Sequence, residues 1–342
     1  MLRLASFVVA AVALAGAALA AAPSEQDVQG LYEGTLAGAK GPQKVEARLV
    51  ACGKGTYKLF LRDAKAAAPA APAAPAAPAP VLPVVPPAVL PAELDAATEG
   101  DAVKFTGKIG TAAATGIWAD GAVRLTVGHT TNLLKRVVRN SPTLGAKPPA
   151  GAIVLVGGTN FDEMTCPDNK DGTPQEWTKT EPVAIQVPRG GMYSKRQFDG
   201  SFRLHVEFLL PLMSEARDQG RGNSGCYLPN GEEIQVLDSF GMTTYTGGCC
   251  GGIYKYKDPD AFDKFSLASA PPLQWQTYDI EYHVQKDGGK PTGKPRVTVF
   301  HNGIKIHDNF QLEKGAKAGG FQWQDHGNPV QYRNIWVLPL EK

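Results

Sequence analysis

The sequence has little excess charge and lacks long runs with helical periodicity. Its 35 Lys and Arg residues nearly balance 33 Asp and Glu residues, which leaves a formal net charge of +2 over 342 residues. Nucleic acid is bound through basic patches or stripes, so this balance argues against a nucleic-acid partner. The 38 Gly and 27 Pro residues supply many turn signals. The composition therefore favours an all-β protein.

Apolar runs long enough to cross a membrane are also lacking. The longest run, residues 7–19, follows Arg3 and is followed by small residues up to Ala22. A spanning helix needs about 20 apolar residues, and this order of a positive charge, an apolar run and small residues is typical of a cleaved export signal. We expect residues 1–22 to be a signal peptide, and the protein to be periplasmic or secreted with no membrane span.

The five cysteines lack the Cys-x-x-Cys spacing of structural zinc sites. Disulfides are allowed in an exported protein, and the odd count leaves at least one thiol outside any intrachain bridge. Adjacent Cys249 and Cys250 cannot easily bond to each other without strain. We expect Cys226 to pair with one of them, because they flank the same polar loops.

An Ala-Pro repeat interrupts the N-terminal half. Prolines fix φ and lack an amide donor, so residues 64–94 are predicted to be a disordered, extended insertion. Alternating polar and apolar residues on both sides of it predict short strands. These segments are 30–36, 44–50 and 56–61 before the repeat, and 102–106, 115–119 and 122–127 after it. We interpret residues 23–135 as one small β-domain that contains the insertion, and residues 136–150 as a linker.

Residues 151–342 form a dense succession of strand patterns and turns. In residues 201–208 the apolar side chains alternate with Arg203, His205 and Glu207, which places these three on one face. The Asn302-Gly303 pair between two apolar strands predicts a type I′ hairpin. About 190 residues of this kind are typical of a two-sheet sandwich.

Several segments occur in an order that is known from one family. They are residues 198–208, 222–225, 233–239, 251–254, 275–277, 301–303 and 324–327. On these motifs, the stretch 157–338 resembles the 3-keto-disaccharide hydrolase domain family. The resemblance implies a concanavalin-A-like jelly roll, an exported bacterial protein, and cleavage of glycosides whose sugar carries a ketone at C3.

A ketone at C3 acidifies the hydrogen at C2, so one base can start an elimination that expels the glycosidic oxygen from C1. This chemistry needs a base, a group that polarises the ketone and an acid for the leaving group. It does not need the paired carboxylates of ordinary glycosidases. Alternation places Glu233 and Gln235 on the polar face of a strand whose other face carries Ile234 and Val236.

Provided that the neighbouring strands share a sheet, more polar residues can join that face. We predict as catalytic residues Glu233, His326 and Glu207, and as substrate-binding residues Arg221, Asn223, Gln235, His205 and Gln324. His205, Glu207, Glu233 and His326 also have metal-ligand chemistry but lack a fixed spacing, so a divalent metal remains a hypothesis. Residues 168–172 resemble part of a calcium loop without its final acid and are interpreted as a surface turn.

Some side chains keep two interpretations at this stage. Asp238 is either catalytic or the cap of a turn into Ser239, and Trp275 is either a core residue or a platform for a sugar. Trp323 is expected to face the core, and His301 and His307 are expected to be solvated beside their hairpin.

Two other functions are consistent with the same sequence. The first is a carbohydrate-binding protein that uses the polar face without catalysis. The second is a surface-assembly protein whose residues 24–130 dock a protein partner.

Overall fold

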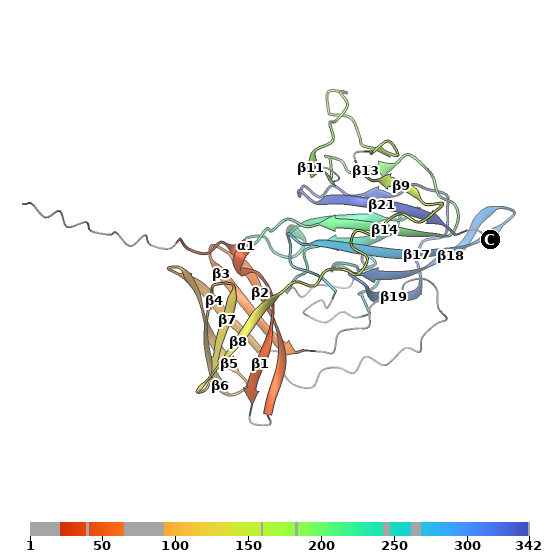
Figure 1. Cartoon of the computed structure of the whole chain (residues 1–342). Coiled ribbons are helices and arrows are strands. Elements are labelled where there is room, and N and C mark those ends of the chain that lie inside the picture. The colour runs from red at the N-terminus through yellow and green to blue at the C-terminus, as the bar shows by residue number, and fades with distance from the viewer. Residues whose placement is uncertain are drawn as a thin grey trace, which may run out of the picture.

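The computed structural model describes residues 21–38, 41–64, 92–158, 160–181, 184–241, 247–260 and 268–340. The expected signal peptide therefore lies almost wholly outside the described residues, as does the Ala-Pro repeat up to residue 91. None of the described helices is long and apolar enough to cross a membrane. The protein is nearly all β, with a closed barrel followed by a two-sheet sandwich (Figure 1).

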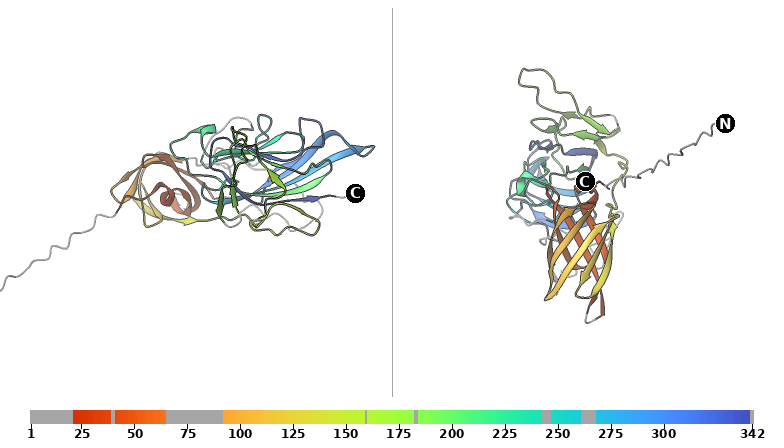
Figure 2. Two further views of the ribbon diagram at one scale, coloured as in Figure 1. Left: turned by 90° about the horizontal axis from the view of Figure 1, so that it is seen from above. Right: turned by 90° about the vertical axis from the view of Figure 1, so that its left-hand side faces the viewer.

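Eight antiparallel strands, each paired with its neighbour in sequence, close the N-terminal barrel. They are β1 (Gly30–Gly38), β2 (Gly41–Gly53), β3 (Thr56–Asp63), β4 (Ala92–Glu99), β5 (Ala102–Ile109), β6 (Ala112–Ala119), β7 (Ala122–Val127) and β8 (Thr130–Val137). The strands on the two sides of the insertion thus belong to one domain, which Figure 2 shows nearly end-on in its left view. The short helix α1 (Glu25–Val28) precedes β1.

Side chains fill the barrel, as expected for eight strands. Alternate residues of β2, among them Val45, Ala47 and Leu49, are fully buried in its core. The Trp118 indole donates a 2.8 Å hydrogen bond to the Tyr32 hydroxyl, which itself donates to the Val28 carbonyl. These bonds satisfy the buried polar atoms of the Trp118 and Tyr32 side chains.

Two predicted boundaries of the N-terminal half were wrong. The insertion was extended to residue 94, but β4 begins at Ala92, and β8 includes Arg136 and Val137 of the predicted linker. The rest of that linker lies along the sandwich, where Thr143 and Gly145 hydrogen-bond to side chains of one sheet. Strands β4 and β8 are longer than predicted because they pair with neighbouring barrel strands, and local sequence patterns do not reveal this pairing.

The C-terminal sandwich has a smaller and a larger antiparallel sheet. The smaller has the order β10 (Met164–Thr165), β13 (Met192–Ser194), β20 (Gln322–Trp323), β15 (Asn223–Tyr227) and β16 (Glu233–Leu237). The larger has the order β11 (Lys179–Glu181), β12 (Ala184–Gln186), β21 (Gln331–Pro339), β14 (Phe202–Leu209), β17 (Trp275–Asp287), β18 (Lys290–His301) and β19 (Ile304–Gln311), with β9 (Ile153–Val156) also on β21. This is the jelly-roll sandwich that the resemblance implied.

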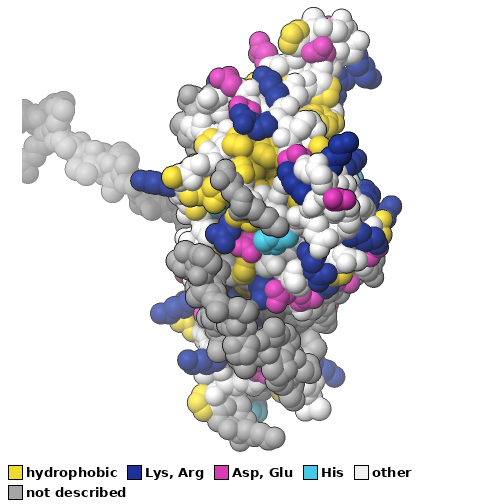
Figure 3. Space-filling view, turned by 90° about the vertical axis from the view of Figure 1, so that its right-hand side faces the viewer, with side chains coloured by type: hydrophobic (Ala, Val, Ile, Leu, Met, Phe, Trp, Pro, Cys, Tyr) yellow, Lys and Arg dark blue, Asp and Glu magenta, His cyan; other side chains and the backbone are white. Residues whose placement is uncertain are grey.

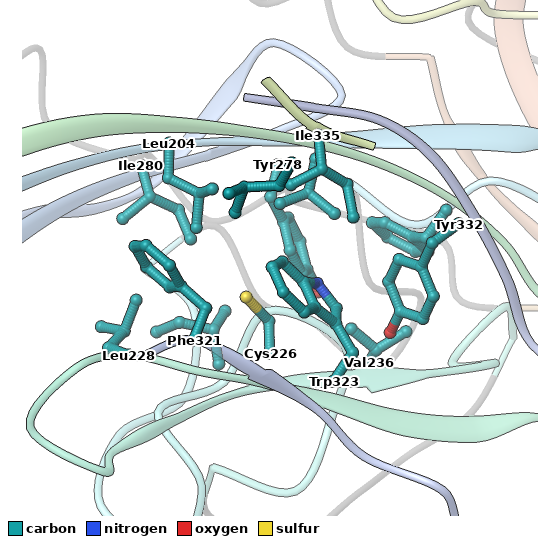
Figure 4. Close-up of a cluster of buried hydrophobic side chains, with 14 of the residues drawn as sticks. Leu204, Cys226, Leu228, Val236, Tyr278, Ile280, Phe321, Trp323, Tyr332 and Ile335 are labelled. Atoms are coloured by element: carbon teal, nitrogen blue, oxygen red, sulfur yellow. The ribbon is translucent and has the colours of Figure 1, made fainter. Parts of the chain in front are cut away.

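The core lies between the two sheets, and Figure 4 shows its side chains interdigitating. Leu204 and Tyr278 point down from the larger sheet, and Cys226, Val236 and Trp323 point up from the smaller one. The prediction that Trp323 faces the core is confirmed.

The predicted disulfide was wrong, since none of the five cysteines is disulfide-bonded. Alternation turns Cys226 into the core, where burial raises the pKa of its thiol. The Cys250 thiol lies 3.1 Å from the Tyr278 hydroxyl instead.

The hairpin between β18 and β19 has its predicted turn. Asn302 and Gly303 have φ of 50° and 77°, the positive values that a type I′ turn requires. The prediction that His301 and His307 are solvated was wrong, because both rings are fully buried. Burial lowers the pKa of His301 to about 3 and that of His307 to about 4, so both are neutral near pH 7.

The barrel and the sandwich touch through loops of the smaller sheet. The Arg217 guanidinium donates a 2.6 Å hydrogen bond to the Cys52 carbonyl, and Arg48 stacks over the Phe240 ring. On the face turned away from the barrel, Figure 3 shows basic side chains interspersed with acidic ones rather than aligned in a stripe.

Candidate functional site

The outer face of the smaller sheet carries a row of polar and aromatic side chains across four strands. Strand register places Tyr193 beside Gln322, Gln322 beside Tyr227, and Tyr227 beside Glu233. The residues next to them in sequence, such as Trp323 and Ile234, face the core, so this row faces outward. Four strands thus build one continuous polar surface.

Glu233 is largely desolvated in this row, with 7% of its surface exposed. A Cβ on Gly225, in the adjacent strand, would lie 2.2 Å from the Glu233 Oε1 atom. Glycine at position 225 is therefore what leaves room for the carboxylate. Burial raises the pKa of Glu233, while a hydrogen bond from Tyr227 and the charges of Lys314 and Lys255 work against that rise.

Tyr227 links Glu233 to a second polar residue. Its hydroxyl hydrogen-bonds to the Glu233 carboxylate and accepts a 3.3 Å bond from the Gln324 amide. Burial, followed by the nearby carboxylate, raises the pKa of this phenol, so Tyr227 stays protonated and can act as a donor.

A second polar row runs beside the first. Gln235 donates a 2.9 Å bond to the side-chain oxygen of Gln219, and the Asn223 amide donates to the same residue. The Asn223 Oδ1 atom is buried and has no hydrogen-bond partner in the described part of the chain. Buried amide oxygens are normally paired, which makes this atom a candidate acceptor for a ligand.

A cleft of about 420 Å³ opens beside the first row. Its lining includes Tyr193, Tyr227 and Gln322 of the first row, together with Gly231, Lys317 and the 318–321 segment. Glu233 does not itself line this cleft but contacts it through Tyr227. The volume and the mixture of aromatic and polar groups suit a small polar ligand.

The model of one family, the 3-keto-alpha-glucoside-1,2-lyase-like domain, matches residues 151–338. The chain belongs to this family. Two crystal structures of candidate glycosyl hydrolases from Parabacteroides distasonis ATCC 8503 are similar to part of this chain. The first is 31% identical with a TM-score of 0.47, covering 56% of this chain and 85% of that one. The second is 18% identical with a TM-score of 0.40, covering 56% and 95%. No curated protein matches the sequence.

Membership of the 3-keto-alpha-glucoside-1,2-lyase-like family makes the protein a carbohydrate-active enzyme. Of the predicted site residues, Glu233, Gln235, Asn223 and Gln324 come together on the outer face of the smaller sheet.

Arg221 lies near this group but is engaged elsewhere. Its guanidinium is buried and donates bonds of 2.9 and 2.6 Å to Asp238. Asp238 also accepts from the Phe240 amide, so it stabilises the turn after β16 and does not reach the cleft. Of its two interpretations, the structure favours the turn cap.

His326 follows β20 in an exposed loop, and no described residue hydrogen-bonds to its ring. Its neighbour Asp325 holds that loop by accepting from the Gly190 and Gly327 amides. A catalytic role for His326 stays a prediction.

The prediction that His205 and Glu207 share a face with Glu233 was wrong. Both lie on β14 of the larger sheet, on the far side of the core, beneath the segment 141–146. The His205 ring hydrogen-bonds to Asp279 at 2.6 Å and stacks on Trp336. Alternation shows on which face of a strand a side chain lies but not to which sheet the strand belongs.

Hydrogen bonds connect His205, Glu207, Asp279 and Arg333 into a second cluster, in which positive and negative charges balance. Burial lowers the pKa of His205, but the hydrogen bonds of Asp279 and Glu207 outweigh it and raise the pKa to about 9. Burial raises the pKa of Glu207, but bonds from His205, Asn334 and Arg333 outweigh it and lower the pKa to about 2. The cluster therefore fastens the segment 141–146 to the sheet, which is a structural role.

Trp275 also lies on the larger sheet, with the Arg333 guanidinium 4.0 Å above its ring, so it is neither a core residue nor a platform beside Glu233. In the segment 168–172, Asp171 accepts bonds from Thr173, as in an ordinary turn. Across the described ranges, no group of three or more His, Cys, Asp and Glu side chains converges to hold a metal ion.

Sequence reasoning missed Tyr193 and Tyr227, which line the cleft, and Gly225, which makes room for Glu233. The alternation of Gly225, Cys226 and Tyr227 indicated that Tyr227 and Gly225 share a face. It did not indicate that this face adjoins Glu233, because that depends on the register of the hairpin.

Proposed function

We propose that the protein cleaves glycosides whose sugar carries a ketone at C3, with Glu233 as the base that removes the C2 proton. The observation that carries this proposal is the Tyr227–Glu233 pair beside the cleft. Family membership supports the substrate class, and the sheet geometry supports the choice of base.

The environment of Glu233 suits a base. Burial raises the pKa of its carboxyl, which makes the ionised form a stronger proton acceptor. The ammonium groups of Lys255 and Lys314 act in the other direction and favour the ionised form that catalysis needs. A bond from Tyr227 orients the carboxylate, which limits the conformations that it can adopt.

The proposed reaction is an elimination followed by a hydration. Glu233 takes the C2 proton, and the electron pair moves into an enolate between C2 and C3. The enolate reforms the ketone, makes a double bond between C1 and C2, and expels the glycosidic oxygen, which takes up a proton. Water then adds at C1 while C2 regains a proton, which yields the free 3-keto sugar. Gln235, Gln324 and the Asn223 Oδ1 atom are proposed to hold sugar hydroxyls.

The test uses purified protein with 3-keto-glucosides and their unoxidised parents, with and without divalent metal ions. We expect aglycone release from the 3-keto substrates alone. In deuterium oxide the sugar product carries deuterium at C2 beyond that of an enzyme-free control. Cleavage without enzyme-dependent labelling would refute the elimination, and no release from any 3-keto substrate would refute the activity.

Variants separate catalysis from binding. Glu233→Gln is expected to lower turnover by at least about 100-fold, the usual contribution of a general base, while sugar binding survives. Glu281→Gln is the matched control, because Glu281 is a partly exposed carboxylate on the larger sheet that pairs with Arg203. Binding that persists in a wild-type protein without turnover would instead identify a carbohydrate-binding protein.

Export remains part of the proposal and rests on the first 22 residues of the sequence. Mass spectrometry of the N-terminus after expression with an intact signal would detect cleavage near Ala20 or Ala22. An uncleaved cytoplasmic product would contradict it.

A further inference from the structure

Two lysines lie around Gly231, a glycine that lines the cleft. Gly231 lies in the turn between β15 and β16, and its φ is +80°. The nearest atoms to the place where a Cβ would be are the Lys314 and Lys317 Nζ atoms, each 3.9 Å away. The two ammonium groups therefore lie no more than twice that distance apart and flank an unfilled space.

Neither ammonium group forms an ion pair with a carboxylate of the described residues. Lys314 donates to the Gly231 carbonyl, and Lys317 forms no ion pair. Some other exposed lysines of the sandwich are paired, as Lys286 is with Asp199 and Lys305 is with Asp308.

The acids nearest to the two lysines in sequence are engaged elsewhere. Glu313 pairs with Lys294 at 3.1 Å. Glu232 is buried and accepts bonds from the Asn230 side chain and the Glu313 amide. Neither of these acids therefore forms an ion pair with Lys314 or Lys317.

The lysine end and the Glu233 end belong to one site. Lys317 and Tyr227 line the same cleft, and the Tyr227 phenol contacts Glu233. The charge of Lys314 is also felt by the Glu233 carboxyl. A sugar held against Tyr227 can thus present a substituent to the lysines.

We propose that Lys314 and Lys317 form a subsite for an anionic substituent, so that the preferred substrates are glycosides carrying a carboxylate or sulfate group. This inference rests on the proposed function for its reaction, but the binding preference can be measured without turnover. Two unpaired ammonium groups attract one anion more strongly than a neutral hydroxyl, and the attraction weakens with salt.

The experiment compares three 3-keto-glucosides whose leaving group is glucose, glucuronate or 6-sulfated glucose. We expect kcat/KM to be roughly tenfold higher for an anionic leaving group at low salt, the ratio that about 1.4 kcal/mol provides. In Lys317→Gln the ratio of anionic to neutral kcat/KM falls towards one. Lys290→Gln is the matched control, since it removes one exposed charge from β18 of the other sheet and keeps the ratio.

The outcomes distinguish this inference from the proposed function. Equal kcat/KM for neutral and anionic substrates in the wild type overturns the subsite and leaves the activity standing. An equal loss on both substrates in Lys317→Gln also overturns it, because the lysine then serves the reaction or the fold. If no 3-keto substrate is cleaved, calorimetry with a glucuronate disaccharide and its neutral counterpart still tests the subsite. Preference for either the carboxylate or the sulfate substrate identifies the anion.

Discussion

The hydrogen bond between His205 and Asp279 predicts that the sandwich loses stability at mildly alkaline pH. The ring is fully buried between Asp279 and Glu207, whose hydrogen bonds hold the pKa at about 9 against an ordinary value of 6.5. The folded state therefore keeps a proton on His205 in a pH range where the unfolded chain has lost it. Raising the pH in this range favours unfolding.

The size and the window of the effect follow from these two pKa values. The contribution of His205 is complete below pH 6.5 and is lost as the pH rises through 9. The difference corresponds to about 3 kcal/mol at 1.36 kcal/mol per pKa unit. His301 and His307 have lowered pKa values, so their contribution is lost as the pH falls below 6.5 and does not change this window.

Urea unfolding between pH 6 and 10, followed by tryptophan fluorescence, measures the effect. Four of the five tryptophans lie in residues 151–342, so the signal reports mainly on the sandwich. Asp279→Asn is expected to make the decline between pH 6.5 and 9 shallower, because it removes one of the two carboxylates that raise the pKa of His205. His283→Gln, at an exposed position on β17, is the matched control and is expected to keep the decline.

An identical decline in the wild type and in Asp279→Asn would refute the assignment to His205. A wild-type stability that rises between pH 6.5 and 9 would refute the protonated state itself.

Three further substitutions test other parts of the structure. Gly225→Ala places a Cβ 2.2 Å from Glu233 Oε1, so we expect loss of turnover and a cost of about 1–3 kcal/mol in urea unfolding; full activity would contradict the proposed base. Gly303→Ala meets Pro142 at 2.4 Å with φ at +77°, which predicts destabilisation by about 1–3 kcal/mol and a lower melting temperature. Glu46→Ala removes the buried carboxylate that three arginines surround and is expected to cost the barrel about 3–5 kcal/mol by circular dichroism; an unchanged melting curve would contradict this.

Much of the fold could be predicted because alternation is a local property of the chain. Residues 201–208 and the Asn302-Gly303 turn gave strands and a hairpin that the structure contains. The barrel was harder, since the inward residues of β4 include Ala92 and Ala96, whose small side chains give a weak periodic signal. Closure through the pairing of β1 with β8 joins residues about a hundred positions apart, which no local pattern reports.

In the candidate site, too, local patterns do not reveal which strands lie side by side. Glu233 and Gln235 were found because Ile234 and Val236 alternate with them, and the resemblance gave their face a chemistry. His205 shows a similar alternation but lies on the other sheet. Face assignment within a strand is local, whereas convergence of strands depends on the order of strands within a sheet.

The pairing of Tyr227 with Glu233 is determined by the turn that joins β15 to β16. The Leu228 amide donates to the Glu232 carbonyl and the Gly231 amide donates to the Leu228 carbonyl, which closes the turn over Pro229-Asn230-Gly231. This turn aligns Tyr227 with Glu233 and Gly225 with Gln235. A shift of one residue would place a core side chain such as Cys226 beside Glu233 and turn Tyr227 inward. The turn that sets this register also carries Gly231, so the same few residues determine both the Tyr227–Glu233 pair and the space between the two lysines.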